Sequence, residues 1–105
     1  MTRIVWTNPA VEQFELIYRV ELRRRVYKAI TGLARFPRRG RVLPEAARFP
    51  DLVFPVELRE IVFPRLLRVL YRYDEPSDAV IILAIFFRGQ EVGGDWVGGL
   101  LKRSE

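Results

Sequence analysis

The chain of 105 residues contains neither cysteine nor histidine. Without cysteine it has no disulfide, no thiolate nucleophile and no zinc-thiolate site, and without histidine it has no imidazole base and no imidazole metal ligand. Any catalysis would depend on arginine, lysine, tyrosine, serine, threonine, carboxylate or backbone groups. We therefore expect no metal and no cofactor. The length fits a single domain over residues 1–105, because so short a chain buries only roughly 60–68% of the surface that its unfolded form exposes.

Long hydrophobic runs and targeting signals are also missing. The longest apolar run covers residues 79–87, whereas a membrane-spanning helix needs about 20 residues. The first residues lack the apolar segment and small-residue cleavage site of a signal peptide. We expect a cytoplasmic protein in which residues 79–87 form a central strand that is buried on both faces.

Lysine is scarce, whereas arginine is abundant. Only Lys28 and Lys102 are present among 18 basic residues, which leaves 16 arginines (18 minus 2), and the net charge is +5. Guanidinium groups favour bidentate contacts with phosphate or carboxylate, but a GC-rich genome would produce the same bias. Residues 19–48 hold ten basic and two acidic side chains, a local charge of +8. The other residues sum to −3, so one contiguous third carries all of the excess.

The hydrophobic pattern predicts a strand, two helices and three further strands. The first strand covers residues 3–7, and Asn8 as cap with Pro9 in the first turn begins a helical region. Apolar residues recur there at steps of three and four, at Val11, Phe14, Tyr18, Leu22, Val26, Ala29, Ile30 and Leu33. A hairpin of two helices with a break near residues 20–21 is favoured over one long helix of some 26 residues. Residues 56–63, 66–74 and 79–88 then alternate like strands, with short turns between them.

This order predicts an α+β domain of type βααβββ. The strands form an antiparallel twisted sheet, and the two N-terminal helices pack on one of its faces. In the middle strand Tyr71 and Tyr73 share the helix side, whereas Arg68 and Arg72 share the open side. A glycine-rich tail begins at about residue 89 and contains five of the seven glycines of the chain. We expect this tail to be mobile.

The predicted open face carries the first candidate site, which consists of Arg59, Arg68, Arg72 and Arg88. Fixed guanidinium groups can stabilise the charge that develops on phosphate oxygens without a metal, and RNA supplies its own nucleophile in the 2′-hydroxyl. The alternative is a solvated sheet face or a docking surface for an acidic partner, and the sequence alone favours that alternative.

A second basic group lies in and after the helices. Side chains of this group would bind a nucleic-acid backbone or a partner without sequence preference, at Arg23, Arg24, Arg25, Lys28, Arg38 and Arg39. The alternative is the ordinary exposed side of an amphipathic helix. Asp74, Glu75 and Asp78 are compatible with a cation site, but the segment between them is typical of a hairpin turn, and we interpret it as a turn.

Four segments together resemble the RelE/ParE superfamily of toxins from bacterial type II toxin-antitoxin systems. They are Trp6-Thr7 before Pro9-Ala10, LREIV at 58–62, LRVLYR at 67–72 and IILAIFFR at 81–88. The resemblance spans residues 3–96. It implies a domain that inhibits growth until a cognate antitoxin covers it with an acidic C-terminal segment, and it is compatible with a homodimer. RelE-like members cleave mRNA on the ribosome, whereas ParE-like members poison DNA gyrase.

The resemblance also assigns residues. Arg68 and Arg88 match the catalytic arginines of RelE-like members, with Arg59 and Arg72 in supporting positions. The antitoxin is expected to cover these four arginines and Trp96. RelE-like enzymes have a tyrosine six residues after the second arginine, where this chain has Gly94, and this departure favours binding over cleavage. Gyrase and ribosome both stay open as targets, and a degenerate, non-toxic RNA- or protein-binding module of the same fold is the alternative.

Overall fold

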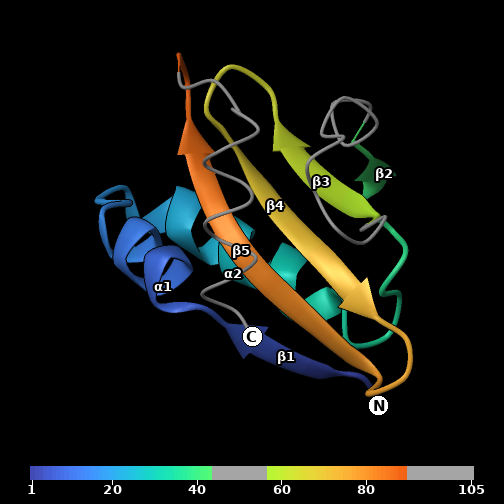
Figure 1. Ribbon diagram of the computed structural model, residues 1–105. Helices are drawn as coiled ribbons and strands as arrows, with labels where there is room; N and C mark the ends of the chain where they lie inside the picture. The colour runs from blue at the N-terminus through green and yellow to red at the C-terminus, as the bar shows by residue number, and fades with distance from the viewer. Residues whose placement is uncertain (44–56, 90–105) are drawn as a thin grey trace.

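The computed structural model describes residues 1–43 and 57–89. The sites expected at Gly94 and Trp96 and the glycine-rich tail beyond residue 89 lie outside these ranges. The elements are β1 (Arg3–Trp6), α1 (Asn8–Glu15), α2 (Val20–Gly32), β2 (Arg41–Val42), β3 (Leu58–Phe63), β4 (Leu67–Asp74) and β5 (Ala79–Phe87). Both helices lie against one face of the sheet (Figure 1). The α+β class and the position of the helices are as predicted. No helix in the described ranges is long and apolar enough to cross a membrane.

Two separate helices form the hairpin, as the pattern favoured over one long helix. The first begins after Thr7, whose hydroxyl accepts a hydrogen bond from the backbone N–H of Ala10 at 3.4 Å. The predicted cap at Asn8 is therefore wrong by one residue, because Asn8 is already helical. Pro9 lies in the first turn, where its missing N–H costs no hydrogen bond.

The connection between the helices departs from the predicted apolar face. Tyr18 was expected to face the sheet but is 86% exposed, whereas Ile17 is buried. The chain leaves the helix after Glu15, so the helical period does not extend through these positions. Arg23 of α2 reaches back, and its Nε donates to the carbonyl of Ile17 at 2.8 Å. This hydrogen bond links the start of α2 to the end of α1.

The sheet has the order β1-β5-β4-β3-β2 and is mixed. The three long strands pair antiparallel as predicted, but β1 pairs parallel with β5. The edge strand β2 pairs antiparallel with β3 and was not predicted. Tight turns determine only the pairing of consecutive strands, so the sequence pattern carried no information on the partner of β1. The prediction that residues 79–87 form a central strand is confirmed, because β5 lies between β1 and β4 and is buried almost throughout.

The core lies between the helices and the sheet, where Val26 and Ile30 of α2 pack with Tyr71 and Ile82 of the strands. The pairing of β4 with β5 shifts register between Leu70 and Tyr71. As a result, strict alternation fails in β5: Ile82 lies on the helix side, although simple counting groups it with the residues of the open side.

Candidate functional site

The face of the sheet opposite the helices is called the open sheet face here. Its charged members are Arg41 of β2, Glu60 of β3, and Arg68, Arg72 and Asp74 of β4. Val69 and Tyr71 of β4 belong to the helix-side core, so Leu70 between them points to the opposite face. Directly opposite residues of an antiparallel pair share a face. Glu60 pairs with Leu70 and therefore lies on the open sheet face. The predicted placement of Arg68 and Arg72 on one face is therefore confirmed. The prediction that this face is open is wrong, because Leu70 is 1% exposed and Phe86, which lies opposite Arg68, is 2% exposed.

Glu60 is the residue that the sequence reasoning missed. Its side chain is only 1% exposed, and its carboxylate accepts a hydrogen bond from Arg41 Nε at 2.6 Å. The other carboxylate oxygen lies 3.4 Å from Nη1 of Arg68. Two guanidinium groups thus share one buried carboxylate, which offsets much of the cost of burying it. The only signal in the sequence was the alternation that places Glu60 on the same face as Arg68 once the hairpin is paired.

The arginines of the open sheet face are held by neighbouring side chains. The guanidinium of Arg68 lies 5.9 Å from the ring centre of Phe86, which is within the range of a cation–π contact. Nη1 of Arg72 lies 3.8 Å from a carboxylate oxygen of Asp74. Each of the two arginines therefore has a carboxylate within 4.0 Å. Glu60 also pairs with Arg41, so the positive charge of this face is compensated only in part.

Arg59 does not belong to this group, and the prediction that placed it beside Arg68 and Arg72 is wrong. It lies opposite Tyr71 in the pairing of β3 with β4, and Tyr71 is part of the core on the helix side. The sequence could not decide this point, because one residue of register moves a side chain to the other face of a sheet.

Arg59 instead anchors the loop that joins α2 to β2. Its Nη1 donates to the carbonyls of Arg38 at 3.0 Å and Gly40 at 2.7 Å. The Tyr71 hydroxyl holds the same loop, since it accepts from the Gly40 N–H at 2.8 Å and donates to the carbonyl of Pro37 at 2.9 Å. Burial raises the pKa of Tyr71 above its usual 10.0, although the Gly40 hydrogen bond and the Arg59 charge act in the opposite direction.

Arg88 lies just beyond β5, which ends at Phe87, one residue earlier than predicted. Its backbone N–H donates to the carbonyl of Leu66 at 3.0 Å. The side chain is exposed and has no acidic partner within residues 1–43 and 57–89. Arg88 thus lies at the margin of the open sheet face.

The basic residues of α2 do not form one uniform patch. Arg23 is bound to the end of α1, and the guanidinium of Arg25 lies 5.6 Å from the ring centre of Phe63. Arg24 and Lys28 are exposed, and Nη1 of Arg24 lies 3.8 Å from a carboxylate oxygen of Glu21. Only part of the predicted basic run is thus free for a polyanion.

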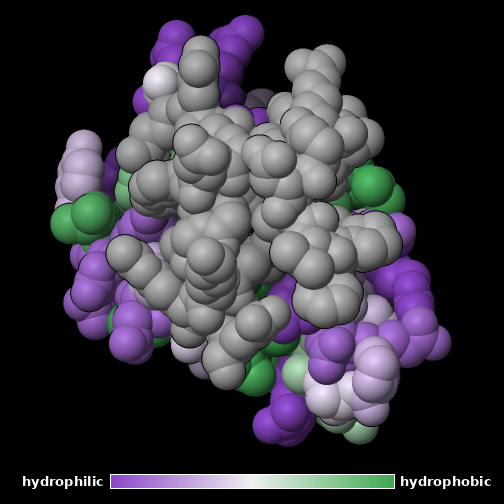
Figure 2. Space-filling view, viewed as in Figure 1, coloured by the Kyte–Doolittle hydropathy of each residue, from purple (hydrophilic) through white to green (hydrophobic). Residues whose placement is uncertain are grey.

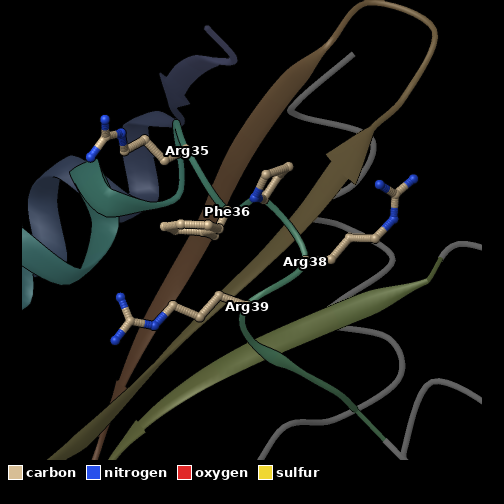
Figure 3. A pocket seen from close by; sticks show the side chains of 5 residues that line it. Arg35, Phe36, Arg38 and Arg39 are labelled. Carbon is tan, nitrogen blue, oxygen red and sulfur yellow. The ribbon is translucent and has the colours of Figure 1, made fainter.

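A shallow pocket follows α2 and is lined in the described part of the chain by Arg35, Phe36, Pro37, Arg38 and Arg39 (Figure 3). Arg38 is paired, since its Nη2 lies 3.0 Å from Glu75 and its guanidinium lies 4.8 Å from the ring centre of Tyr73. Sequence reasoning identified Arg38 and Arg39 but missed Arg35 and Phe36.

The residues of the predicted turn, 75–78, form the β4–β5 turn. The Asp78 carboxylate accepts hydrogen bonds from Thr2 at 2.6 Å and Tyr73 at 2.8 Å, and these bonds lower the pKa of Asp78. The described residues contain no cluster of acidic side chains suited to a metal ion.

None of the four tyrosines of the chain is on the open sheet face. Tyr71 and Tyr73 lie on the helix side, Tyr18 follows α1, and Tyr27 is in α2. Because the chain has no histidine or cysteine, no phenol, imidazole or thiol is available on this face for proton transfer.

Comparison with known proteins places the fold. A family model described as the ParE toxin of the type II toxin-antitoxin system parDE matches residues 4–92. Among solved structures, the toxin-antitoxin complex RelBE2 from Mycobacterium tuberculosis is similar, with 21% identity, a TM-score of 0.63, and coverage of 83% of this chain and 98% of that chain. The isolated E. coli RelE toxin has 11% identity and a TM-score of 0.61, with coverage of 97% of this chain and 98% of that chain. No curated protein matches the sequence.

Proposed function

The chain belongs to the ParE toxin family of type II toxin-antitoxin systems, and from this membership we propose that it inhibits growth in the cytoplasm by binding DNA gyrase rather than by cleaving mRNA. The observation that carries the proposal is the placement of the tyrosines. Cleavage of RNA by its own 2′-hydroxyl needs groups that accept and donate protons. In the described residues of the open sheet face both carboxylates are paired with arginines: Glu60 with Arg41 and Arg68, and Asp74 with Arg72.

The binding mechanism uses surfaces rather than a reactive centre. Leu16 and Val20 are 67% and 58% exposed at the connection between α1 and α2, where a small hydrophobic patch is visible at the left margin of Figure 2. Exposed apolar side chains next to basic ones are typical of surfaces that bind a partner protein. The helical hairpin is therefore the proposed contact with the target.

An assay with both targets tests the proposal. The purified chain, DNA gyrase, supercoiled plasmid and ATP should yield linear DNA after detergent and protease treatment, because a poison traps the cleaved complex. The same chain with ribosomes and mRNA should leave the message intact. Induction in cells should trigger the SOS response while translation continues. Codon-positioned mRNA cuts without trapped gyrase would overturn the proposal.

The second candidate is a ribosome-dependent mRNA endonuclease. It is supported by the position of Arg68 on the open sheet face, where the resemblance expects a catalytic arginine, with 26% of the side chain exposed. If this candidate is correct, Arg68→Ala abolishes the cuts, and Arg3→Ala on the edge strand serves as the control. Undiminished cutting by Arg68→Ala would contradict it. Harmless expression in both assays would favour the non-toxic binding module.

We also propose that a cognate antitoxin lays an acidic segment over the open sheet face and contacts Arg68, Arg72 and Arg88. The net charge of +5 and the exposed guanidinium of Arg88 support an acidic partner. The neighbouring solved structures include the RelBE complexes of two bacteria. A small adjacent gene with an acidic C-terminus should rescue growth when co-expressed, and replacement of its acidic residues by Gln or Asn should remove the rescue.

A further inference from the structure

The loop between α2 and β2 presents an exposed aromatic ring between two arginines. We call residues 35–39 the Arg-Phe loop. Phe36 is 62% exposed, and in Figure 3 its ring lies between the side chains of Arg35 and Arg39, whereas Arg38 points to the other side. A single exposed apolar side chain is common on a protein surface, so the ring is informative only together with the two cations beside it. The ring and its two cations thus form one combined surface.

Two of the three charges of this loop are not paired within the described part of the fold. Arg38 is paired with Glu75, but Arg35 and Arg39 are exposed and have no acidic partner in the described part of the chain. Arg39 lies near the last turn of α2, where a Cβ added to Gly32 would lie 3.9 Å from its Nη1. Two cations next to a ring therefore remain available for a ligand.

The fold holds this loop in place from beneath. Arg59 and Tyr71 make four hydrogen bonds to the backbone of residues 37–40. Tyr71 is fully buried, so the anchor is part of the core. A loop held in this way loses little conformational freedom on binding, which is how a preorganised site gains affinity.

The combination of an exposed aromatic ring with two unpaired arginines indicates the chemical class of the ligand. Guanidinium groups match the oxygens of phosphate, and an exposed aromatic ring stacks on an unpaired base of any identity. An acidic peptide would use the arginines but has no planar group for the ring. We propose that the Arg-Phe loop binds single-stranded nucleic acid, with a base stacked on Phe36 and phosphates held by Arg35 and Arg39. This goes beyond the proposed function, which concerns binding to a protein target.

Binding of a fluorescein-labelled oligo(dT) 12-mer to the purified chain, followed by anisotropy over a salt series, tests the proposal. The double variant Arg35→Gln/Arg39→Gln should lower the slope of log affinity against log salt by about 1.4, because each phosphate contact on a single strand contributes about 0.7. Phe36→Leu should weaken binding roughly tenfold and leave the slope unchanged, because leucine keeps the apolar character but cannot stack.

The double variant Arg3→Gln/Arg65→Gln is the matched control, because both arginines are exposed and it removes the same charge from other parts of the surface. It should keep the wild-type slope to within about 0.5. An equal loss of slope in the control, or an unchanged affinity for Phe36→Leu, would overturn the proposal. Binding of a decaglutamate peptide without binding of oligo(dT) would overturn it in favour of an acidic peptide. The oligonucleotide assay contains no gyrase, so its result does not depend on whether the chain binds gyrase.

Discussion

The arginines of the open sheet face and those of the Arg-Phe loop are the same residue type in different electrostatic settings. Arg68 lies 3.4 Å from the buried carboxylate of Glu60, whereas Arg35 and Arg39 are exposed without an acidic partner in the described ranges. Charges that are paired within a sheet contribute to the fold, and charges that are unpaired at the surface are available to ligands. Substitutions in the first region should change stability, and substitutions in the second should change binding.

Gly40 directly follows the Arg-Phe loop and packs against Tyr71 and the backbone of Glu60, and Gly40→Ala should give the largest effect. A Cβ at this position would lie 2.7 Å from the ring and hydroxyl of Tyr71 and 2.8 Å from the backbone oxygen of Glu60. Because one of these atoms is backbone, the strand or the loop must shift. We expect a loss of about 3 kcal/mol in the free energy of unfolding, measured by urea denaturation.

Gly32→Ala is the control for this prediction. The nearest atom to its added Cβ is 3.9 Å away, and alanine is favoured over glycine within a helix by up to about 1 kcal/mol. It should therefore leave the unfolding midpoint unchanged or raise it. Equal midpoints for the Gly40→Ala variant and the wild type would contradict the close packing between Gly40, Tyr71 and β3.

Glu60→Gln should give the next largest effect. The substitution removes the negative charge that Arg41 and Arg68 share. Loss of one partner from a fully buried ion pair costs about 3–5 kcal/mol, but the two arginines are 65% and 26% exposed, so water compensates for part of the cost. We expect about 2 kcal/mol by urea denaturation. Arg41→Gln should cost less, because Glu60 keeps Arg68. A cost below about 0.5 kcal/mol for Glu60→Gln would show that the carboxylate does not stabilise the fold.

Tyr71→Phe should have a smaller effect on stability but should also affect the Arg-Phe loop. It removes the hydroxyl that bonds the Gly40 N–H and the Pro37 carbonyl, and an unsatisfied buried N–H costs about 1–2 kcal/mol. Because the Arg-Phe loop loses one of its two anchors, binding of oligo(dT) should also weaken. Unchanged binding in a variant that is measurably less stable would separate the anchor from the ligand site.

The same tyrosine predicts a loss of stability at alkaline pH. Its pKa is raised by burial above 10.0 in the folded chain. Below pH 10 the phenol is protonated in both states, and above it the unfolded chain loses its proton first. The free energy of unfolding should therefore fall as the pH rises from about 10 through the folded pKa. Tyr71→Phe should flatten this decline more than Tyr18→Phe, whose side chain is 86% exposed.

The smallest effect on stability is expected for Arg35→Gln/Arg39→Gln. Both side chains are exposed, so the free energy of unfolding should change by no more than about 0.5 kcal/mol. The variant nevertheless should lose much of its affinity for oligo(dT). A large loss of stability would show that these arginines contribute to the fold, and the contrast with the open sheet face would disappear.

Local pattern was a good guide to the elements. The helical hairpin, the strands β3 to β5 and the buried character of Ala79–Phe87 followed from apolar spacing and turn residues. The pattern failed at Tyr18 and Asn8, where the helix boundaries decide which residues face inward. Each of these errors lies at the end of a helix, where a period of 3.6 residues no longer applies.

The composition alone established that this chain has no thiol and no imidazole. The alternation of side chains along the predicted strand placed Arg68 and Arg72 on one face. Only the tertiary structure decided that Arg59 faces the helices, that Glu60 lies between Arg41 and Arg68, and that β1 runs parallel to β5. The physical reason is that register and strand order depend on contacts between segments far apart in the chain. A shift of one residue changes the face of every side chain in a strand without any change in its sequence.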